Sequence, residues 1–231
     1  MPVIDREHTP AAIAVPFPTL AAADTVERKP ISLLLLADRI LAGTLLAAAL
    51  PVMTGVALAI RLMSRRSPLV AHLRVGHNGL PFWMLKFRTM WPKTSPLPRE
   101  TGWIEQIVKP EFRESKPLTD PRVTSRFAAW CRAHSIDELP QLWHALRGEM
   151  SLVGPRPLTQ FELDKHYGDH AQRVLERTPG MTGLWQVLGR NSLTYKQRLR
   201  LDLFLARNYS WPVYVWILIK TIRKVFTGTG A

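Results

Sequence analysis

The chain has 231 residues, which is enough for one large domain or two small ones. It carries 31 Lys and Arg against 18 Asp and Glu, a formal net charge of +13, which points to an anionic partner: nucleic acid, an acidic membrane surface or phosphorylated substrates. Eight tryptophans among many arginines favour a membrane interface. The single cysteine, Cys131, excludes an internal disulfide framework and a cysteine zinc cluster.

The N-terminal part divides into a leader and a long apolar segment. Residues 1–30 are rich in Pro and Ala without sustained periodicity, which predicts a disordered leader. The 21 residues from Ile40 to Ile60 carry no charge. A helix of that length covers about 30 Å, the thickness of the hydrocarbon layer of a bilayer. We therefore expect a membrane helix over residues 31–63.

Pro51 stands in the middle of this segment, where a proline removes a backbone hydrogen bond and kinks a helix. Basic residues flank both ends of the segment: Arg28, Lys29 and Arg39 before it, and Arg61, Arg65, Arg66 and Arg74 after it. A spanning helix has one basic end, so two basic ends suit a re-entrant helix that bends at Pro51 and returns to the same face. A spanning helix stays open as the alternative, because membrane helices tolerate proline.

Residues 71–90 predict a β-hairpin, with the turn at Gly76–Gly79, where Asn78 and Gly79 tolerate positive φ. Lys86 and Arg88 are two residues apart on the second strand, so both side chains point to one face. They form either a two-cation clamp on phosphate or a solvated basic edge. The Pro-rich residues 91–121 are expected to form a loop with a helical turn.

Residues 135–157, SIDELPQLWHALRGEMSLVGPRP, hold the adjacent carboxylates Asp137 and Glu138 before a short helical pattern that ends at Gly148. Arg156 follows between two prolines, which restrict its backbone. Two carboxylates and an arginine near a helix N-terminus suit a phosphate and a divalent cation. The same letters also fit an S-x-x-E capping box from Ser135 to Glu138, which is a purely structural device.

The C-terminal third predicts three helical segments around a glycine-containing run. Residues 158–177 are polar and helical, and residues 178–191 contain turns with Gly180, Gly183 and Gly189. Residues 192–208 form a basic amphipathic helix. Residues 209–226 are apolar with one positive face, and such a helix lies in the headgroup plane of a membrane or packs against the core.

Three ordered blocks resemble the bacterial sugar transferase family: KFRTM (86–90), SIDELPQLWHALRGEMSLVGPRP (135–157) and PGMTGLWQVLGRN (179–191). These monotopic phosphoglycosyl transferases start exopolysaccharide and glycan assembly on a polyprenyl phosphate. The resemblance covers residues 38–226. It implies an α+β fold: a mainly helical membrane-associated domain with a re-entrant N-terminal helix, a small β-hairpin and interfacial amphipathic helices. It also implies a catalytic domain, residues 64–231, on the cytoplasmic face of the bacterial inner (plasma) membrane.

The resemblance implies transfer of a hexose-1-phosphate from a nucleotide-diphospho-sugar such as a UDP-hexose to polyprenyl phosphate. Asp137 takes the role of nucleophile in a covalent phospho-sugar intermediate, and Glu138 helps to hold Mg²⁺. The cations expected around the substrate phosphates are Lys86, Arg88, Arg132, Arg156 and Arg190. The nucleotide-sugar pocket is expected to include Gln186 and Asn191, and the break in the membrane helix falls at Pro51.

Two other function classes compete with the enzyme. A basic membrane-surface adaptor that keeps the fold without the chemistry accounts for the charge and the apolar segment, but it does not require the acidic pair beside clustered cations. A nucleic-acid binder accounts for the charge alone, and the chain lacks a recognisable recognition module. The partners expected are therefore the nucleotide-sugar donor, polyprenyl phosphate and a membrane, and no nucleic acid. The sugar stays open among galactose, glucose and N-acetylated hexoses.

Overall fold

The computed structural model describes residues 31–91, 102–107, 123, 125–189 and 192–228, so the expected leader, 1–30, lies outside the described residues. The helices and strands are α1 (Ile31–Ser64), β1 (Leu69–Val75), β2 (Pro81–Phe87), β3 (Ile104–Ile107), α2 (Arg126–Ala133), α3 (Leu142–Arg147), β4 (Ser151–Val153), α4 (Gln160–Glu162), α5 (Ala171–Leu175), β5 (Gly180–Thr182), α6 (Leu184–Leu188), α7 (Tyr195–Arg207) and α8 (Trp211–Thr227).

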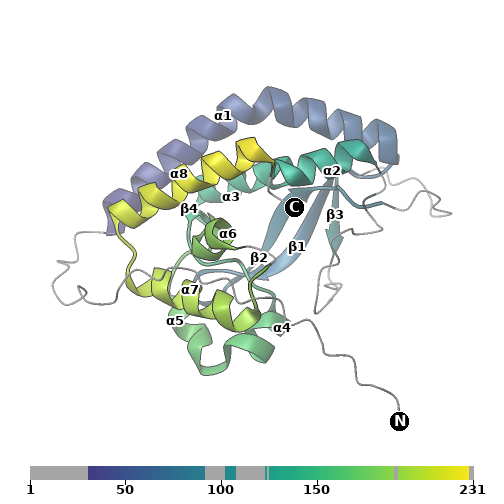
Figure 1. Ribbon diagram of the computed structural model, residues 1–231. Helices are drawn as coiled ribbons and strands as arrows, with labels where there is room; N and C mark the ends of the chain where they lie inside the picture. The colour runs from purple at the N-terminus through teal and green to yellow at the C-terminus, as the bar shows by residue number, and fades with distance from the viewer. Residues whose placement is uncertain (1–30, 92–101, 108–122, 124, 190–191, 229–231) are drawn as a thin grey trace, which may run out of the picture.

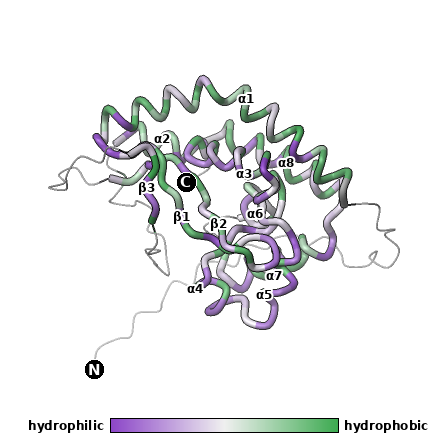
Figure 2. Tube along the Cα trace, turned by 180° about the vertical axis from the view of Figure 1, so that it is seen from behind, coloured by the Kyte–Doolittle hydropathy of each residue, from purple (hydrophilic) through white to green (hydrophobic). Residues whose placement is uncertain are grey.

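The molecule is layered, with the most apolar helices on one side (Figure 1). Helices α1, α8 and α2 lie together at the top, the strands lie below them, and α4, α5 and α7 lie at the opposite end (Figure 1). Hydrophobic residues follow α1 for most of its length, whereas hydrophilic residues gather around α5 and α7 (Figure 2). The mixture of helices and small sheets agrees with the expected α+β class.

Helix α1 is one continuous helix of 34 residues that contains Pro51. It is bent, and its two ends lie closer to the rest of the molecule than its middle does (Figure 1). A proline inside a helix causes such a bend, because it removes a backbone donor and its ring clashes with the preceding turn. The segment Leu33–Ser64 is long and apolar enough to cross a membrane, by length and composition.

Both ends of α1 are attached to the rest of the fold. Near the first end, the buried Asp38 carboxylate accepts hydrogen bonds from the Leu152 N–H (3.1 Å) and the Tyr214 hydroxyl (2.5 Å). Near the second end, Val56 and Ile60 pack in a core with residues of β2 and α2. The contacts at both ends hold α1 along the top of the molecule.

The predicted hairpin is confirmed and belongs to a three-stranded sheet of order β2-β1-β3. Its turn has positive φ at Asn78 (53°) and Gly79 (82°). The loop with a helical turn that was expected over 91–121 is wrong at residues 104–107, which form β3, parallel to β1. A strand of four residues is too short for its periodicity to be recognised, and pairing with the free edge of β1 determines its conformation.

A second, two-stranded parallel sheet joins β4 and β5. Gly154 and Gly180 allow the two backbone segments to approach closely here, since a Cβ on Gly180 would lie 2.0 Å from the Gly154 nitrogen. Two of the glycines in the 178–191 run, Gly180 and Gly183, therefore lie against the Gly154 backbone.

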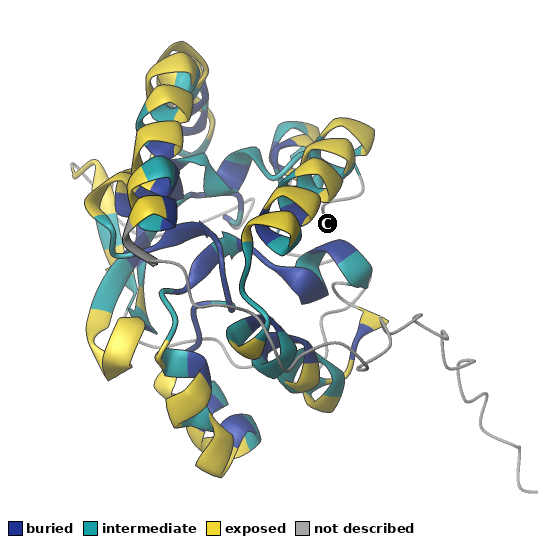
Figure 3. Cartoon of the chain, turned by 90° about the vertical axis from the view of Figure 1, so that its left-hand side faces the viewer, coloured by how far each residue is buried: buried dark blue, intermediate teal, exposed yellow. Residues whose placement is uncertain are grey.

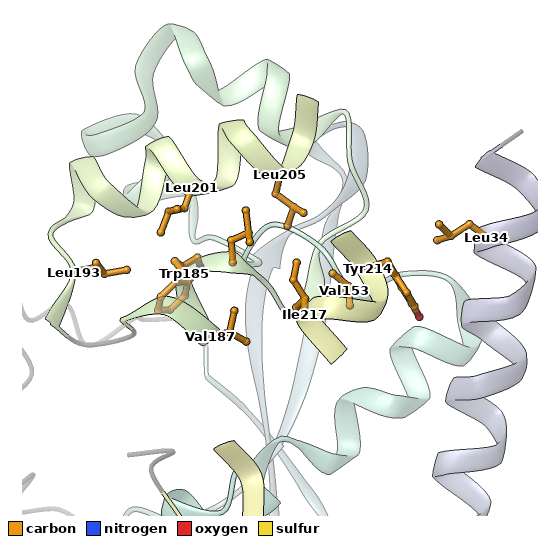
Figure 4. Packing of buried hydrophobic residues seen from close by; sticks show 10 residues of the cluster. Leu34, Val153, Trp185, Val187, Leu193, Leu201, Leu205, Tyr214 and Ile217 are labelled. Atoms are coloured by element: carbon orange, nitrogen blue, oxygen red, sulfur yellow. The ribbon is translucent and has the colours of Figure 1, made fainter. Parts of the chain in front are cut away.

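A hydrophobic core that includes Val153 of β4 joins α6, α7 and α8 to one end of α1, with Trp185, Leu201, Leu205 and Ile217 among its other members (Figure 4). The predicted helices over 192–208 and 209–226 are confirmed as α7 and α8. The polar helical segment predicted over 158–177 is confirmed as a series of short turns: α4, a π-helical turn, a 3₁₀ turn and α5, with a break at Gly168, whose φ is 45°. A glycine in that conformation interrupts α-helical geometry.

Large apolar side chains are exposed on the top layer, and the outer turns of α1 and α8 are among the exposed parts in Figure 3. On α1 these side chains include Leu33, Leu36, Ile40, Leu50, Leu58 and Leu62, and on α8 they include Trp211, Trp216, Ile219, Ile222 and Phe226. Phe226 is 81% exposed. Contiguous apolar surface of this kind marks an interaction surface.

Candidate active site

The two adjacent carboxylates lie on a 3₁₀ turn, Ile136–Gln141, that connects α2 to α3. Ser135 precedes the turn in the left-handed conformation (φ 56°), and its side chain makes no cap hydrogen bond. The capping box from Ser135 to Glu138 is therefore not formed, and Asp137 is not the N-cap of α3, which begins at Leu142. The structural interpretation of this acidic pair is thus contradicted.

Glu138 contacts a cation from a distant part of the chain. Its Oε1 lies 2.7 Å from the Nζ of Lys86, which is on the edge strand β2. The Glu138 side chain is 30% exposed, whereas Asp137 is buried, at 9%. One carboxylate is thus neutralised by a lysine and partly open to solvent, while its neighbour is shielded from water.

This environment changes the ionisation of Asp137. Burial raises the pKa of Asp137 to about 6, and the charge of Glu138 acts in the same direction. Lys86 and Arg132 act to lower this pKa, so both expected cations lie within electrostatic range of Asp137. At pH 7 most molecules still carry the Asp137 carboxylate, desolvated and beside two cations, which is a suitable state for a nucleophile.

Arg88 shares the sheet face of Lys86 but is occupied by other contacts. Lys86, Val70 and Glu105 form one row across the sheet, and the Arg88 guanidinium forms an ion pair with Glu105. The Arg88 Nε donates to the Ser67 carbonyl at 2.7 Å. The two-cation clamp therefore has one cation beside Glu138 and one held against β3.

Arg156 lies in a second basic cluster with Arg74, Arg198 and Trp185. The guanidinium of Arg156 lies 5.1 Å from the centre of the Trp185 ring, and that of Arg198 lies 4.9 Å from the same ring. Arg74 forms an ion pair with Glu162 at 3.4 Å. Burial acts to raise the pKa of Glu162, but Arg156, the Thr159 N–H and Arg74 outweigh it and lower that pKa.

His72 lies on the sheet face between the two basic groups. Burial, followed by the charges of Arg74, Lys86 and Arg88, lowers the pKa of His72 to about 4. The sequence did not predict His72 as a site residue, and it placed Arg74 only among the basic residues that flank the membrane segment. The signal was present, because Val70, His72 and Arg74 alternate on β1 and so share the face that carries Lys86.

The nucleotide-sugar pocket residues are only partly described. Gln186 lies on α6, and its buried Oε1 has no hydrogen-bond partner among the described residues. The backbone carbonyl of Gln186 accepts a hydrogen bond from the Lys224 Nζ at 3.1 Å. Arg190 and Asn191 lie outside the described residues. An orphaned buried acceptor such as the Gln186 Oε1 is a group that a ligand donor satisfies.

The carboxylates of Asp137 and Glu138, beside Lys86, are the residues that could hold Mg²⁺. Among the described residues, no group of three or more His, Cys, Asp or Glu gathers as a metal site. Mg²⁺ is commonly held by one or two carboxylates, with substrate phosphates and waters completing the shell. Asp137 and Glu138 therefore suit an ion that binds together with a diphosphate.

Comparison with known proteins places the chain in a family. The model of the family described as bacterial sugar transferase matches residues 32–228, which include the acidic turn, both basic groups and every helix and strand given above except the first residue of α1. The chain belongs to this family. The family assignment agrees with the resemblance carried by the three sequence blocks.

Several curated proteins resemble this bacterial sugar transferase chain. It is 43% identical over 161 residues to the exopolysaccharide production protein ExoY of Rhizobium meliloti (strain 1021), covering 69% of this chain and 70% of that protein. It is 42% identical over 166 residues to a UDP-galactose-lipid carrier transferase of Erwinia amylovora, covering 71% of this chain and 34% of the relative. It is 40% identical over 161 residues to an undecaprenyl-phosphate galactose phosphotransferase of Salmonella typhimurium, covering 69% and 33%. The chain thus spans about a third of the length of the last two relatives.

Proposed function

We propose that this protein transfers a hexose-1-phosphate from a UDP-hexose to undecaprenyl phosphate and so starts the assembly of an exopolysaccharide or related glycan. The observation that carries the proposal is the buried Asp137 beside the Lys86–Glu138 ion pair. The names of the relatives support the acceptor and favour galactose or glucose as the hexose. An adaptor does not need a desolvated carboxylate at such a position.

The proposed reaction has two displacements at one phosphorus atom. A carboxylate oxygen of Asp137 attacks the β-phosphorus of the donor, a P–O bond forms, and the bond to the leaving uridine monophosphate breaks. A phosphate oxygen of undecaprenyl phosphate then attacks the same phosphorus and releases Asp137. Mg²⁺ held by Glu138 and the substrate phosphates supplies charge neutralisation when it is bound.

The two basic groups divide the work of binding the donor. Lys86 and Arg132 lie beside Asp137, where negative charge develops during transfer. Arg88 adds positive charge on the same sheet face. Arg156, with Arg74 and Arg198, forms the second group, which we assign to the nucleotide side of the donor. We assign Gln186 to the nucleotide side as well. Arg190 and Asn191, which lie outside the described residues, stay predicted members of the nucleotide-sugar site by their nearness to Gln186 in the sequence.

Helix α1 is proposed to enter the bacterial inner membrane from the cytoplasmic face, bend at Pro51 and return. Three observations support this topology: the bend of α1, the attachment of both its ends to the same domain, and the basic residues at both ends. The exposed apolar residues of α8 lie in the same layer, so α8 is proposed as an interfacial helix.

A turnover assay tests the proposal. The protein in detergent is incubated with Mg²⁺, undecaprenyl phosphate and, in turn, UDP-galactose, UDP-glucose and UDP-N-acetylglucosamine, and the released uridine monophosphate is measured. We expect release with at least one hexose donor and its loss by more than about 1,000-fold in Asp137→Asn. Asp164→Asn, which changes an exposed carboxylate on the π-helical turn, is the matched control and should retain activity. Turnover retained in Asp137→Asn would contradict the nucleophile assignment.

A further inference from the structure

We infer that His144 and Glu149 form a positioning pair that holds the Lys86 strand against the Asp137–Glu138 turn. The inference rests on the proposed function for its catalytic consequence. Its structural content concerns one buried imidazole on α3, a carboxylate five residues later, and a backbone N–H on β2. None of these three groups belongs to the acidic pair or to the phosphate-binding cations.

The contact begins at the edge of the sheet. Among the strands that the structure describes, β2 pairs with β1 alone, so its N–H groups on the other edge need acceptors outside the sheet. The N–H of Leu85 donates to the Nε2 of His144 at 3.1 Å. Because Nε2 accepts, the proton of a neutral imidazole is on Nδ1, and Nδ1 donates to the Glu149 Oε2 at 2.6 Å.

The end of α3 explains why Glu149 is available. Helix α3 ends at Gly148, which has φ 77°, and the N–H groups of Glu149 and Met150 donate to the His144 carbonyl at 3.0 and 3.1 Å. This reversal of the chain returns Glu149 to the side chain of His144. The other oxygen of Glu149 lies 3.1 Å from the Arg147 guanidinium, so the carboxylate is held from two sides.

The imidazole itself has little freedom. His144 is buried, and the Phe82 ring packs edge-on against it with the ring centres 5.6 Å apart. Two hydrogen bonds and one aromatic contact thus fix the position and the tautomer of the ring. A neutral ring held in this way is a rigid acceptor for the edge strand.

The consequence concerns Lys86, the residue after Leu85. The Lys86 ammonium lies 2.7 Å from Glu138, and the turn that carries Glu138 runs directly into α3, which carries His144. These contacts therefore form a closed ring: the acidic turn continues into α3, His144 of α3 binds Leu85, and Lys86, the next residue, returns to Glu138 on the turn. Loss of the His144 contact frees β2 to shift relative to the turn, and a displacement of about 1 Å in a positioned group costs about 100-fold in rate.

The first test measures Lys86 without using turnover. The intact protein is treated with limiting acetic anhydride, and acetylation of each lysine is quantified by mass spectrometry. In His144→Phe, which removes both hydrogen bonds, Lys86 should be acetylated about tenfold faster, while Lys196 and Lys220 should be unchanged. In His144→Gln, which can place an amide oxygen near the former position of Nε2, the rate of Lys86 acetylation should stay close to that of the wild type. Glu149→Ala, a milder change at a partly exposed residue, should also increase the rate at which Lys86 is acetylated.

The second test is a double-mutant cycle on kcat/KM. His144→Phe should lower kcat/KM by about 10- to 100-fold, and His144→Gln should restore it to within about threefold of wild type. In a Lys86→Ala background, His144→Phe should cost almost nothing further, because its effect passes through Lys86. Unchanged Lys86 acetylation in both His144→Phe and Glu149→Ala, or fully additive losses, overturns the inference. If the wild type proves inactive, the proposed function fails, and the acetylation result still decides the inference.

Discussion

At the scale of single residues, two adjacent carboxylates receive different properties from their surroundings. Glu138 has a lysine at 2.7 Å and remains partly exposed, whereas Asp137 loses its water on burial. Environments that separate two neighbouring carboxylates in this way allow one to react and the other to bind. Asp137 and Glu138 therefore suit the roles of nucleophile and metal ligand that the resemblance implies.

The pKa of Asp137 predicts a pH dependence of the reaction. Since burial raises that pKa to about 6, the ionised fraction falls as pH drops below 6, and kcat/KM should show an acidic limb there. Lys86→Met removes a cation that lowers this pKa, so the limb should move to higher pH. The measurement is kcat/KM from pH 5 to 8.5 for both proteins. A limb that stays in place in Lys86→Met would contradict the electrostatic assignment.

The same shift predicts a pH-dependent stability. The pKa is about 6 in the folded protein and 3.8 in the unfolded chain, so the folded state binds more protons between these values. The stability from protonated Asp137 is complete below about pH 4 and is lost as pH rises through 6. Asp137→Asn stays neutral and should be more stable than wild type at pH 7.5, on the order of 2 kcal/mol, but not at pH 4. Denaturant unfolding at both pH values measures the difference in free energy of unfolding between Asp137→Asn and wild type. An equal difference at pH 4 and pH 7.5 would argue against a raised pKa of Asp137.

At the scale of elements, the β4–β5 pair depends on glycine at a backbone crossing. A Cβ on Gly180 would lie 2.0 Å from the Gly154 nitrogen, and backbone atoms cannot yield as a flexible side chain does. Gly180→Ala should therefore cost about 2–4 kcal/mol of unfolding free energy. Gly55→Ala in α1 is the control, since its Cβ would meet nothing within 4 Å, and it should cost nothing. Thermal unfolding in detergent compares Gly180→Ala with Gly55→Ala, and equal midpoints would contradict the close backbone contact between Gly154 and Gly180.

The sequence predicted elements whose pattern is local and long enough to be recognised. The hairpin turn at Asn78–Gly79, the α7 and α8 helices and the end of α3 at Gly148 depend on residues close in the chain, and each is confirmed. Strand β3 and the break of the 158–177 segment at Gly168 were not predicted, because pairing with β1 determines the strand and the positive φ of Gly168 determines the break.

The site was predictable as a set of residues but not as an arrangement. Asp137, Glu138 and Lys86 do lie together. The second cluster arises from long-range packing of Arg156 and Arg198 on Trp185, with Arg74 within electrostatic range of Arg156, which no spacing in the sequence shows. The same holds for the His144–Leu85 contact, which joins residues 59 positions apart.

At the scale of the whole molecule, the apolar layer and the net charge of +13 suggest one orientation on a membrane. In the orientation that we propose, the layer formed by α1 and α8 would face the lipid, and the basic residues of the sheet would lie on the side from which the phosphate of a membrane-bound acceptor approaches. Such an orientation requires both ends of α1 on one side of the membrane.

Cysteine labelling in spheroplasts and inverted vesicles tests this topology. Cysteines placed at Arg28 and Arg66 should both react with a membrane-impermeant maleimide in inverted vesicles and neither in intact spheroplasts. Background from Cys131 should be low, because it is buried, and burial with the charge of Asp137 raises its pKa to about 11. Labelling of the two positions from opposite sides would establish a spanning helix instead.

The covalent intermediate is the most direct test of the proposed function. The protein is incubated with Mg²⁺ and a hexose-labelled UDP-hexose, without undecaprenyl phosphate, then quenched, digested and examined by mass spectrometry. We expect one hexose-phosphate adduct on Asp137, its removal on addition of undecaprenyl phosphate, and its absence in Asp137→Asn. Full turnover without any adduct, or an adduct on another residue, would contradict the account.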